Sequence, residues 1–260
     1  MKVTQSGSLR YIEFESFTGL DVDVRFYSRH GGVSPAPWLS LNQGGTVGDS
    51  RENVVENRRR IFEDLSRPVD SIFDVWQVHG SNVICTSSPR GLKDDHQKAD
   101  AIFTDRKEIT LFMRFADCVP IVLFEPEKKV IGIVHAGWKG TVNSIVVNAI
   151  QAAQQEYGIA PGKWIAGIGP SIGPDHYQVG LEVKEKVEET FGNQIQNVLS
   201  TNGKSISLNL WRANEILLRN AGVKNIEVAE ICTACNNDDW FSHRKENGST
   251  GRFAAVAFLR

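Results

Sequence analysis

Between residues 72 and 135 the chain carries six short segments rich in Val, Ile and Phe, most of them separated by only a few residues. This composition favours β-strands. We expect strands over residues 72–78, 82–86, 101–104, 110–115, 119–125 and 130–135. Most of the connections are too short to hold the helix that a parallel crossover needs. The pattern therefore predicts an α+β fold of layered sheets rather than a regular β–α–β winding.

Helices are predicted on both sides of this strand series. After a Gly- and Asn-rich loop over 38–50, Ser50 can cap a helix whose apolar face we expect to hold Val54, Val55, Ile61, Phe62 and Leu65. A second amphipathic helix, over 141–157, is ended by Gly158. Further helices are expected over 181–191 and 209–221, and strands over 163–168, 224–230 and 252–258.

Composition limits the class of protein. With 41% hydrophobic and 23% charged residues among 260, the chain can bury a sizeable core. A net charge of −2 gives no broad attraction for nucleic acid or anionic lipid, and no apolar run approaches the roughly 20 residues that span a bilayer. Four cysteines are too few for a disulfide scaffold, which indicates a cytoplasmic protein with reduced thiols. Without repeats or linkers, we expect residues 1–260 to form a single catalytic domain.

Three short segments carry the residues best suited to chemistry: QVHG at 77–80, ADCVP at 116–120 and HAGWKG at 135–140. Each places an imidazole or thiol at or just past a predicted strand end, where side chains distant in sequence can converge. His79, Cys118 and His135 form a ligand set suited to zinc or copper, with a fourth position open. The gaps of 39 and 17 residues match no short-range zinc motif, so structural roles for all three remain the alternative from spacing alone.

The combination of motifs resembles the YfiH family of laccase-domain proteins. Matching segments run from LSLNQGGTVGD at 39–49 through DAIFTD at 100–105 and GPSIGP at 169–174 to the C-terminal stretch that begins CTACNNDDWFSHRKENGSTGRF. The resemblance implies a layered α/β/β/α arrangement of mixed sheets, similar to that of a toxin deamidase with a Cys–His site. It also implies that His79, Cys118 and His135 are the metal triad.

Members of that family have been described as purine nucleoside phosphorylases with adenosine deaminase activity. The resemblance therefore implies a Zn²⁺-dependent enzyme that acts on adenosine and inosine, with methylthioadenosine a further candidate, and uses phosphate as co-substrate. Its partner would be a small nucleoside, with no nucleic acid or membrane; the oligomeric state stays open.

Three other functions are considered. The family has also been called a polyphenol oxidase, but six histidines without a His-x-His pair cannot hold the trinuclear copper cluster of a laccase, although Cu²⁺ could bind the triad. A metal-free hydrolase or amidase would use Cys118 as nucleophile and His135 or His79 as base. A non-enzymatic binding module is the fourth.

Further candidates surround the triad. Asp117 and Asp100 can orient a ligand or move protons, so Asp117 joins Cys118 and His135 as a catalytic candidate, and Asp100 joins the substrate-binding ones. Gln77 would share a strand face with His79. Gly137, Gly140 and Thr141 could seat an anion, with positive charge from Lys139 and from Arg58 or Arg59. The remaining candidate substrate contacts lie in polar loops that match family motifs: Asn42, Ser171, His243 and Arg244.

Two features are interpreted as structural. Cys232 and Cys235 form a CxxC pair without a second pair of zinc ligands in sequence, so we expect two ordinary loop thiols. Asp175 and His176 stand where many family members carry a cysteine pair, which puts a catalytic or metal role there in doubt and favours His176 as a surface residue.

Overall fold

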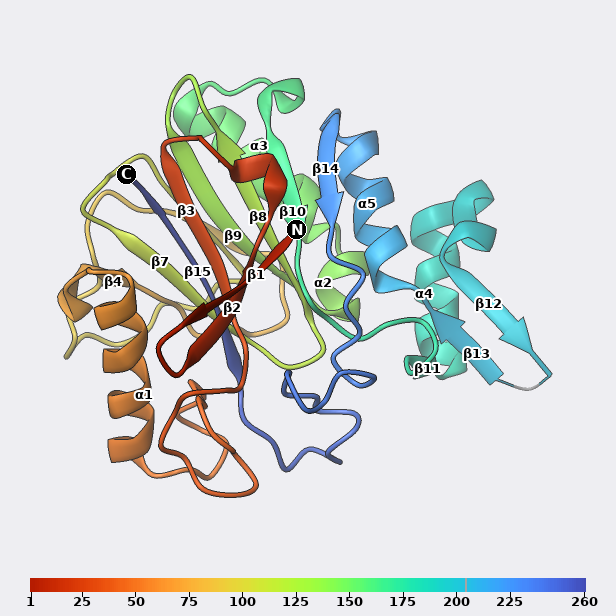
Figure 1. The fold of residues 1–260 in the computed structure, drawn as a ribbon. Helices are drawn as coiled ribbons and strands as arrows, with labels where there is room; N and C mark the ends of the chain where they lie inside the picture. Colours follow the sequence, from red (N-terminus) through yellow and green to blue (C-terminus); the bar gives the residue numbers. More distant parts are fainter. Residues whose placement is uncertain (204) are drawn as a thin grey trace.

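Two six-stranded mixed sheets pack face to face at the centre of a computed structural model that describes residues 1–203 and 205–260 (Figure 1). The first sheet has the order β1 (Lys2–Ser6), β2 (Leu9–Glu13), β3 (Val22–Tyr27), β15 (Phe253–Leu259), β7 (Thr110–Phe115) and β4 (Ile72–Phe73). The second has the order β14 (Asn225–Val228), β10 (Ile165–Ile168), β8 (Val119–Glu125), β9 (Val130–Ala136), β6 (Ala101–Thr104) and β5 (Val83–Cys85). Each sheet combines antiparallel pairs with parallel ones, β4 with β7 in the first and β5 with β6 and β10 with β14 in the second.

The outer face of the first sheet is covered by α1 (Arg51–Asp64), and that of the second by α3 (Ile145–Tyr157) and α5 (Leu210–Asn220). The other two α-helices are α2 (Trp138–Val142) and α4 (Leu181–Phe191). Short 3-10 helices lie at Glu15–Phe17, Val69–Ser71, Pro161–Lys163 and Gly192–Asn197. None of the helices in the described part of the chain has the length and apolar character needed to span a bilayer.

The alternation of side chains along β15 explains the layering. Ala255 and Ala257 face the second sheet in one buried apolar cluster, whereas Val256 and Phe258 belong to the cluster beneath α1. A strand covered on both faces needs apolar residues at every position, and FAAVAFL supplies them. The α/β/β/α arrangement of mixed sheets, and with it the α+β class, is thereby confirmed.

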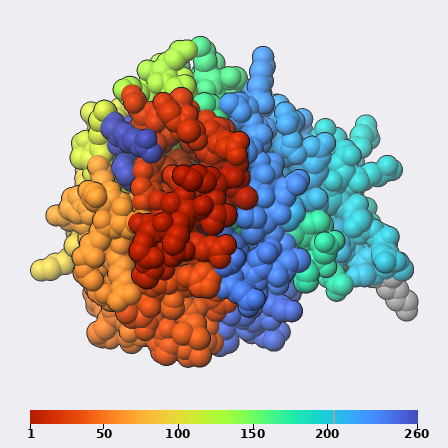
Figure 2. All heavy atoms as spheres, in the orientation of Figure 1, coloured from red at the N-terminus to blue at the C-terminus, as the bar shows by residue number. Residues whose placement is uncertain are grey.

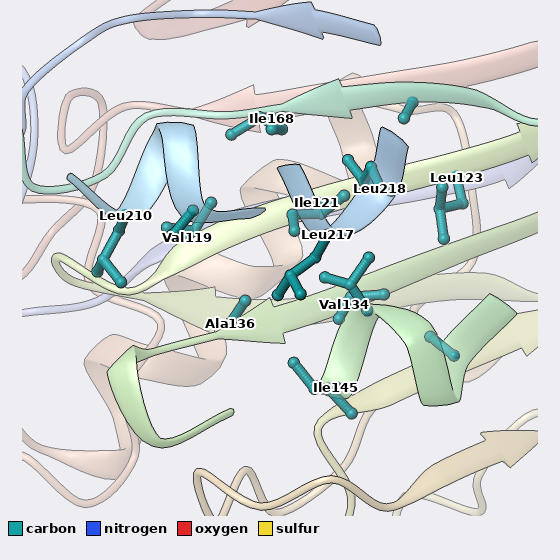
Figure 3. Packing of buried hydrophobic residues seen from close by; sticks show 14 of the residues in the cluster. Val119, Ile121, Leu123, Val134, Ala136, Ile145, Ile168, Leu210, Leu217 and Leu218 are labelled. Atoms are coloured by element: carbon teal, nitrogen blue, oxygen red, sulfur yellow. The ribbon is translucent and has the colours of Figure 1, made fainter. Parts of the chain in front are cut away.

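The outer face of the second sheet packs against α3 and α5. Figure 3 shows Ile145 of α3 and Leu217 of α5 among the side chains of β8 and β9, including Ile121 and Val134. A third sheet lies beside this body, with the order β11 (Gln178–Val179), β13 (Ser205–Leu208) and β12 (Leu199–Asn202). Together with α4 it projects from one side of the molecule, as the cyan atoms in Figure 2 show.

The predicted strands at the centre are confirmed, but several other elements are corrected. Strands β6 to β9 match the expected ranges to within one residue. The segment 72–78, in contrast, is a strand over Ile72–Phe73 alone, because the backbone of Trp76 pairs with residues 97–99 instead. Beyond it, the side chain of Gln77 accepts a hydrogen bond from the backbone N–H of Arg114. The helix predicted over 141–157 is broken at Ser144, whose φ of 56° is left-handed, so α2 and α3 are separate.

Other strands were missed. The N-terminal strands β1 to β3 and the small sheet β11 to β13 were not predicted. Both β1 (KVTQS) and β12 (LSTN) are short and largely exposed, and lack the apolar runs that mark the central strands. Their pairing comes from neighbours rather than from composition.

Gly132 tests the close packing between the second sheet and its helices. It lies opposite Phe103 in the antiparallel pair of β6 and β9, and a Cβ at this position would overlap the Phe103 ring, which also packs edge-on against Trp164 at 5.8 Å between centroids. We expect Gly132→Ala to lower the free energy of unfolding by about 1–3 kcal/mol, measured by denaturant titration. The control is Gly45→Ala, where a Cβ meets no atom within 4 Å; equal stability losses for both variants would contradict the prediction.

Candidate metal centre and cavity

The three segments singled out by sequence converge at one end of the layer between the sheets. His135 is the penultimate residue of β9, Cys118 immediately precedes β8, and His79 lies in the loop after β4. One ligand atom from each of the three residues lies within 4.8 Å of the other two. His135 is buried, Cys118 is half-buried and His79 is exposed. The cluster is therefore anchored in the core and open to solvent on one side.

Asp100 holds this cluster in place. Its carboxylate, buried at the start of β6, accepts a hydrogen bond from His135 Nδ1 at 2.8 Å. The same carboxylate accepts from the backbone N–H groups of His79 at 2.9 Å and Gly80 at 2.7 Å. Because Nδ1 of His135 is engaged, its Nε2 is the free nitrogen. One acid thus sets the orientation of one imidazole and the backbone position of the other.

The donor set fits a metal ion. Two imidazoles and a thiol match the ligand preferences of zinc, and the rings of His79 and His135 stand edge to face with centroids 4.9 Å apart. Gly137 keeps the space beside them free, since a Cβ there would lie 2.8 Å from Cys118 Sγ and 3.2 Å from His79 Cδ2. His79 itself has a left-handed φ of 58°, fixed by its hydrogen bond to Asp100.

Opposite charges stabilise one another in this cluster. Burial alone would raise the pKa of the Cys118 thiol, but the imidazoles of His135 and His79 lower it to about 6. Burial would lower the pKa of His135, but Cys118 and Asp100 raise it to about 9. Hydrogen bonds from His135, Gly80 and His79 likewise outweigh burial and lower the pKa of the Asp100 carboxyl. Cys118 is therefore poised as a thiolate, the form that binds metals.

The cluster opens into a cavity of about 1010 Å³, which is large enough for a nucleoside and an inorganic anion together. Its wall is rich in cationic side chains, drawn from α1, from β7 and from loops. The lining cations are Arg51, Arg58, Arg90, Arg114, Arg244 and Arg252.

Asp74 neutralises part of this positive charge. Its buried carboxylate lies 2.7 Å from Arg90 Nε, 3.4 Å from Arg114 Nη1 and 3.1 Å from His96 Nε2. These cations lower the pKa of the Asp74 carboxyl against the opposing effect of burial. One carboxylate thus serves two arginines and a histidine, and the group keeps a net positive charge.

Arg58 and Arg252 lie near carboxylates, but none of these is in direct contact with them among the described residues. Neither forms an ion pair with any acid in the described part of the chain, and within the same residues Arg58 Nε is fully shielded without a hydrogen-bond acceptor. Burial, followed by repulsion from Arg114, lowers the pKa of Arg58 to about 10, so it stays charged at neutral pH. Burial also lowers the pKa of Arg252. An unpaired cation in a cavity wall is a seat for an anionic ligand.

A second part of the wall is apolar. Trp76, Leu92 and Val55 line the cavity and remain 49%, 55% and 59% exposed. Val55 was predicted on the buried face of its helix; it points instead into the cavity, beyond the edge of the core. Exposed apolar side chains grouped around a cavity are typical of ligand sites, and the Trp76 indole offers a flat surface to an aromatic ring.

The predicted site residues divide into those that meet here and those that do not. Lining the cavity beside the triad are Arg58, Gln77, Asp117, His243 and Arg244. Asp117, whose φ is 78°, accepts bonds from Thr233 Oγ1 and the Arg244 backbone N–H, both at 2.6 Å. Because both of its oxygens accept, it supports the loop that carries Arg244.

The others lie outside the cavity lining. Lys139 is exposed and its ammonium group lies over the Trp138 ring. The helix α2 that carries it has only five residues, too few for an anion site at its N-terminus. Ser171 is buried and accepts a bond from Trp211 Nε1, and Asn42 is buried in its own loop with Asp49. Arg59 pairs with Glu56 on the exposed side of α1. These contacts give each residue a structural role.

Sequence reasoning missed Arg90, Arg114, Arg252 and Trp76. One signal was present: Arg114 is a lone charge in the apolar strand segment TLFMRF, and a charged residue in such a place needs a partner or a function. Arg90, Arg252 and Trp76 stand in loops or at a strand edge, where nothing local distinguishes them.

Comparison with known proteins finds similarity to the laccase-domain family along almost the whole chain. A family model described as multi-copper polyphenol oxidoreductase laccase matches residues 23–260. Purine nucleoside phosphorylase YlmD of Geobacillus stearothermophilus is 38% identical over 237 residues, covering 88% of this chain and 86% of its own. Its namesake from Bacillus subtilis is 32% identical over 248 residues, covering 92% and 89%.

Solved structures agree. The crystal structure of YlmD from Geobacillus stearothermophilus superposes with a TM-score of 0.92 at 33% identity, covering 99% of this chain and 98% of that one. The hypothetical protein YfiH of Bacillus licheniformis gives 0.91 at 32% identity, covering 98% and 97%. Shared sequence, shared fold and a matching family model over most of the length confirm the resemblance: the chain belongs to the YfiH/YlmD family, described as multi-copper polyphenol oxidoreductase laccase.

Proposed function

We propose that this protein cleaves purine nucleosides with phosphate, with zinc at His79, Cys118 and His135. The observation that carries the proposal is that one cavity joins this ligand set to Arg58 and Arg252, two arginines that form no ion pair with an acid among the described residues. Relatives of the chain are named purine nucleoside phosphorylase, and that activity needs both an anion seat and a place for an aromatic base.

Phosphorolysis sets specific demands on the cavity. A phosphate oxygen forms a bond to C1′ of the ribose while the C1′–N9 bond breaks, and the bonding electron pair leaves with the purine, which takes up a proton. Arg58 and Arg252 would bind and orient the phosphate, with Arg114 beside them held by Asp74. Holding phosphate against the sugar makes the attack effectively unimolecular, which is where most of the rate gain would arise.

The apolar wall would hold the base. Trp76 and Leu92 provide a surface against which a purine can stack, and Arg244 lies over the Tyr177 ring at 5.1 Å from its centroid. Burying the base against such groups removes apolar area from water and excludes water from the sugar carbon.

A metal ion would add a second kind of chemistry. When bound, zinc at a three-ligand site supplies a Lewis acid of the kind that activates water for the deamination of adenosine. The residues of the chain contribute orientation, since Asp100 fixes the tautomer of His135 and the turn that carries His79. Adenosine and inosine are thus both proposed substrates, and methylthioadenosine is a further one.

A metal-free Cys–His hydrolase is the competing function, because the Cys118 thiolate and His135 are also a nucleophile and its base. The two are separated by product and by metal. We expect inosine to yield hypoxanthine and ribose 1-phosphate only when phosphate is present, and adenosine to release ammonia as well. Chelation should abolish both reactions and zinc should restore them. Turnover of an amide by the metal-free protein, with no phosphate-dependent cleavage by the zinc form, would refute the proposal.

Arg58 and its neighbour Arg59 form a matched pair for testing the phosphate seat. Arg58→Ala removes a charged donor from the cavity, so we expect the KM for phosphate to rise roughly 10- to 100-fold, with zinc content unchanged. Arg59→Ala changes the next residue on the same helix, which faces solvent, and should leave that KM unaltered. Steady-state kinetics with phosphate as the varied substrate measures both; similar KM values for the two variants would place the phosphate elsewhere.

Asp100→Asn tests the support of the metal cluster. Asparagine keeps the volume but turns an N–H₂ group toward donors that need an acceptor, so we expect the affinity for zinc to fall roughly 10- to 100-fold. Competition with a chromophoric chelator measures the affinity, and circular dichroism checks the fold. The control is Asp105→Asn, an exposed acid just past the same strand. Unchanged zinc binding in Asp100→Asn would remove Asp100 from this role.

A further inference from the structure

A second cluster of metal-ligating side chains lies outside the cavity lining. His176, which follows the GPSIGP turn, meets Cys232 and Cys235 of the C-terminal loop. One ligand atom from each lies within 4.8 Å of the other two. The expectation that these cysteines are ordinary loop thiols rested on the absence of a second ligand pair in sequence, and that for His176 on the missing family cysteines. The third ligand comes instead from a residue 56 positions away.

The distances within the cluster match a tetrahedral ion. His176 Nδ1 lies 3.3 Å from Cys235 Sγ and 3.8 Å from Cys232 Sγ. Zinc bonds of about 2.3 Å to sulfur and about 2.0 Å to nitrogen, at a tetrahedral angle, separate N from S by about 3.5 Å. The two observed N–S distances bracket that value, so the imidazole lies at a suitable distance from each sulfur.

Backbone donors point at the buried sulfur. Gly173 N–H lies 3.2 Å from Cys232 Sγ, and the Cys235 N–H lies 3.4 Å from the same atom. Backbone hydrogen bonds of this kind fix the position of a sulfur that ligates a metal. Gly173 also leaves no room for a side chain, because a Cβ there would lie 3.0 Å from Cys232 Cβ and 3.0 Å from the Trp211 ring.

We propose that His176, Cys232 and Cys235 bind a second zinc ion, separate from the one at His79, Cys118 and His135. Cys232 is buried while Cys235 is exposed, so the fourth position faces solvent and water would fill it. The role is structural, since none of the three side chains lines the cavity. The ion would join the segment after β10 to the C-terminal loop.

That junction supports the cavity wall. Arg244 donates to the carbonyl oxygen of His176 at 3.2 Å, and Thr233, next to Cys232, donates to Asp117. A second zinc would therefore fix the backbone on which Tyr177 and Arg244 stand.

Zinc content of the full-length protein, purified without a metal-affinity tag and dialysed against a weak chelator, tests the proposal. We expect about two equivalents in the wild type and about one in each of Cys235→Ser, His176→Ala and Cys118→Ser. The double variant Cys118→Ser/Cys235→Ser should hold none. Cys85→Ser, which lies in neither cluster, is the control and should keep two. The decisive comparison concerns the second zinc ion alone: Cys235→Ser should lose it and Cys118→Ser should keep it. This comparison is valid whether or not the cavity also binds zinc.

Cobalt substitution adds a spectroscopic test. In Cys118→Ser, Co²⁺ bound by two thiolates should give a strong sulfur-to-metal charge-transfer band in the near ultraviolet, and this band should disappear in the double variant. Because Cys235 is exposed, its replacement should leave the circular dichroism spectrum unchanged. Equal zinc in wild type and Cys235→Ser, or a Cys232–Cys235 disulfide in the isolated protein, would overturn the proposal.

Discussion

The carboxylate of Asp100 is the group on which the geometry of the metal cluster depends. It is buried at the start of β6, where a charge is tolerated only if donors surround it. His135 on the neighbouring strand supplies one donor, and the backbone of the 78–80 turn supplies the others. The need to satisfy one buried charge therefore brings together two ligands that come from different segments, before any metal is present. Cys118 joins them because β8 pairs with β9 in a register that ends beside His135.

The cavity next to this cluster shows a different use of buried charge. Asp74 is surrounded by Arg90, Arg114 and His96, and its carboxylate offsets part of their positive charge. Arg58 and Arg252 have no such partner in the described part of the chain. Keeping an arginine partly buried and unpaired costs stability, so its persistence is explained best by a ligand that supplies the missing negative charge. Phosphate has the charge and the acceptor geometry that a guanidinium matches.

How much of this could be predicted from sequence depends on where the information lies. The central strands carry continuous apolar runs because both of their faces are buried, and composition alone identifies them. The triad could be located by its position at strand ends, and the metal-binding role proposed for it comes from the family resemblance rather than from spacing. Arg114 and Arg58 meet only because β7 packs beneath α1, a contact between elements far apart in sequence. In sequence, Val55 belongs to the apolar face of a helix and Trp76 to a predicted strand, and only the finished fold shows that both side chains are exposed in the cavity.

The two walls of the cavity are supported in different ways, and this bears on the second cluster. The wall formed by α1 rests on an apolar core that includes Ile61, Phe62 and Phe112. The opposite wall, with Tyr177, His243 and Arg244, belongs to loops, and loops of this kind hold their shape through specific polar contacts rather than through a packed core. Asp117 provides one such contact, through Thr233 and the backbone of Arg244. A metal ion at His176, Cys232 and Cys235 would provide another contact next to the same residues. Its metal–ligand bonds would be stronger than the hydrogen bonds of Asp117. When the loop wall is already ordered, less conformational entropy is lost on substrate binding. A structural ion outside the cavity would therefore raise the affinity for substrate without touching it.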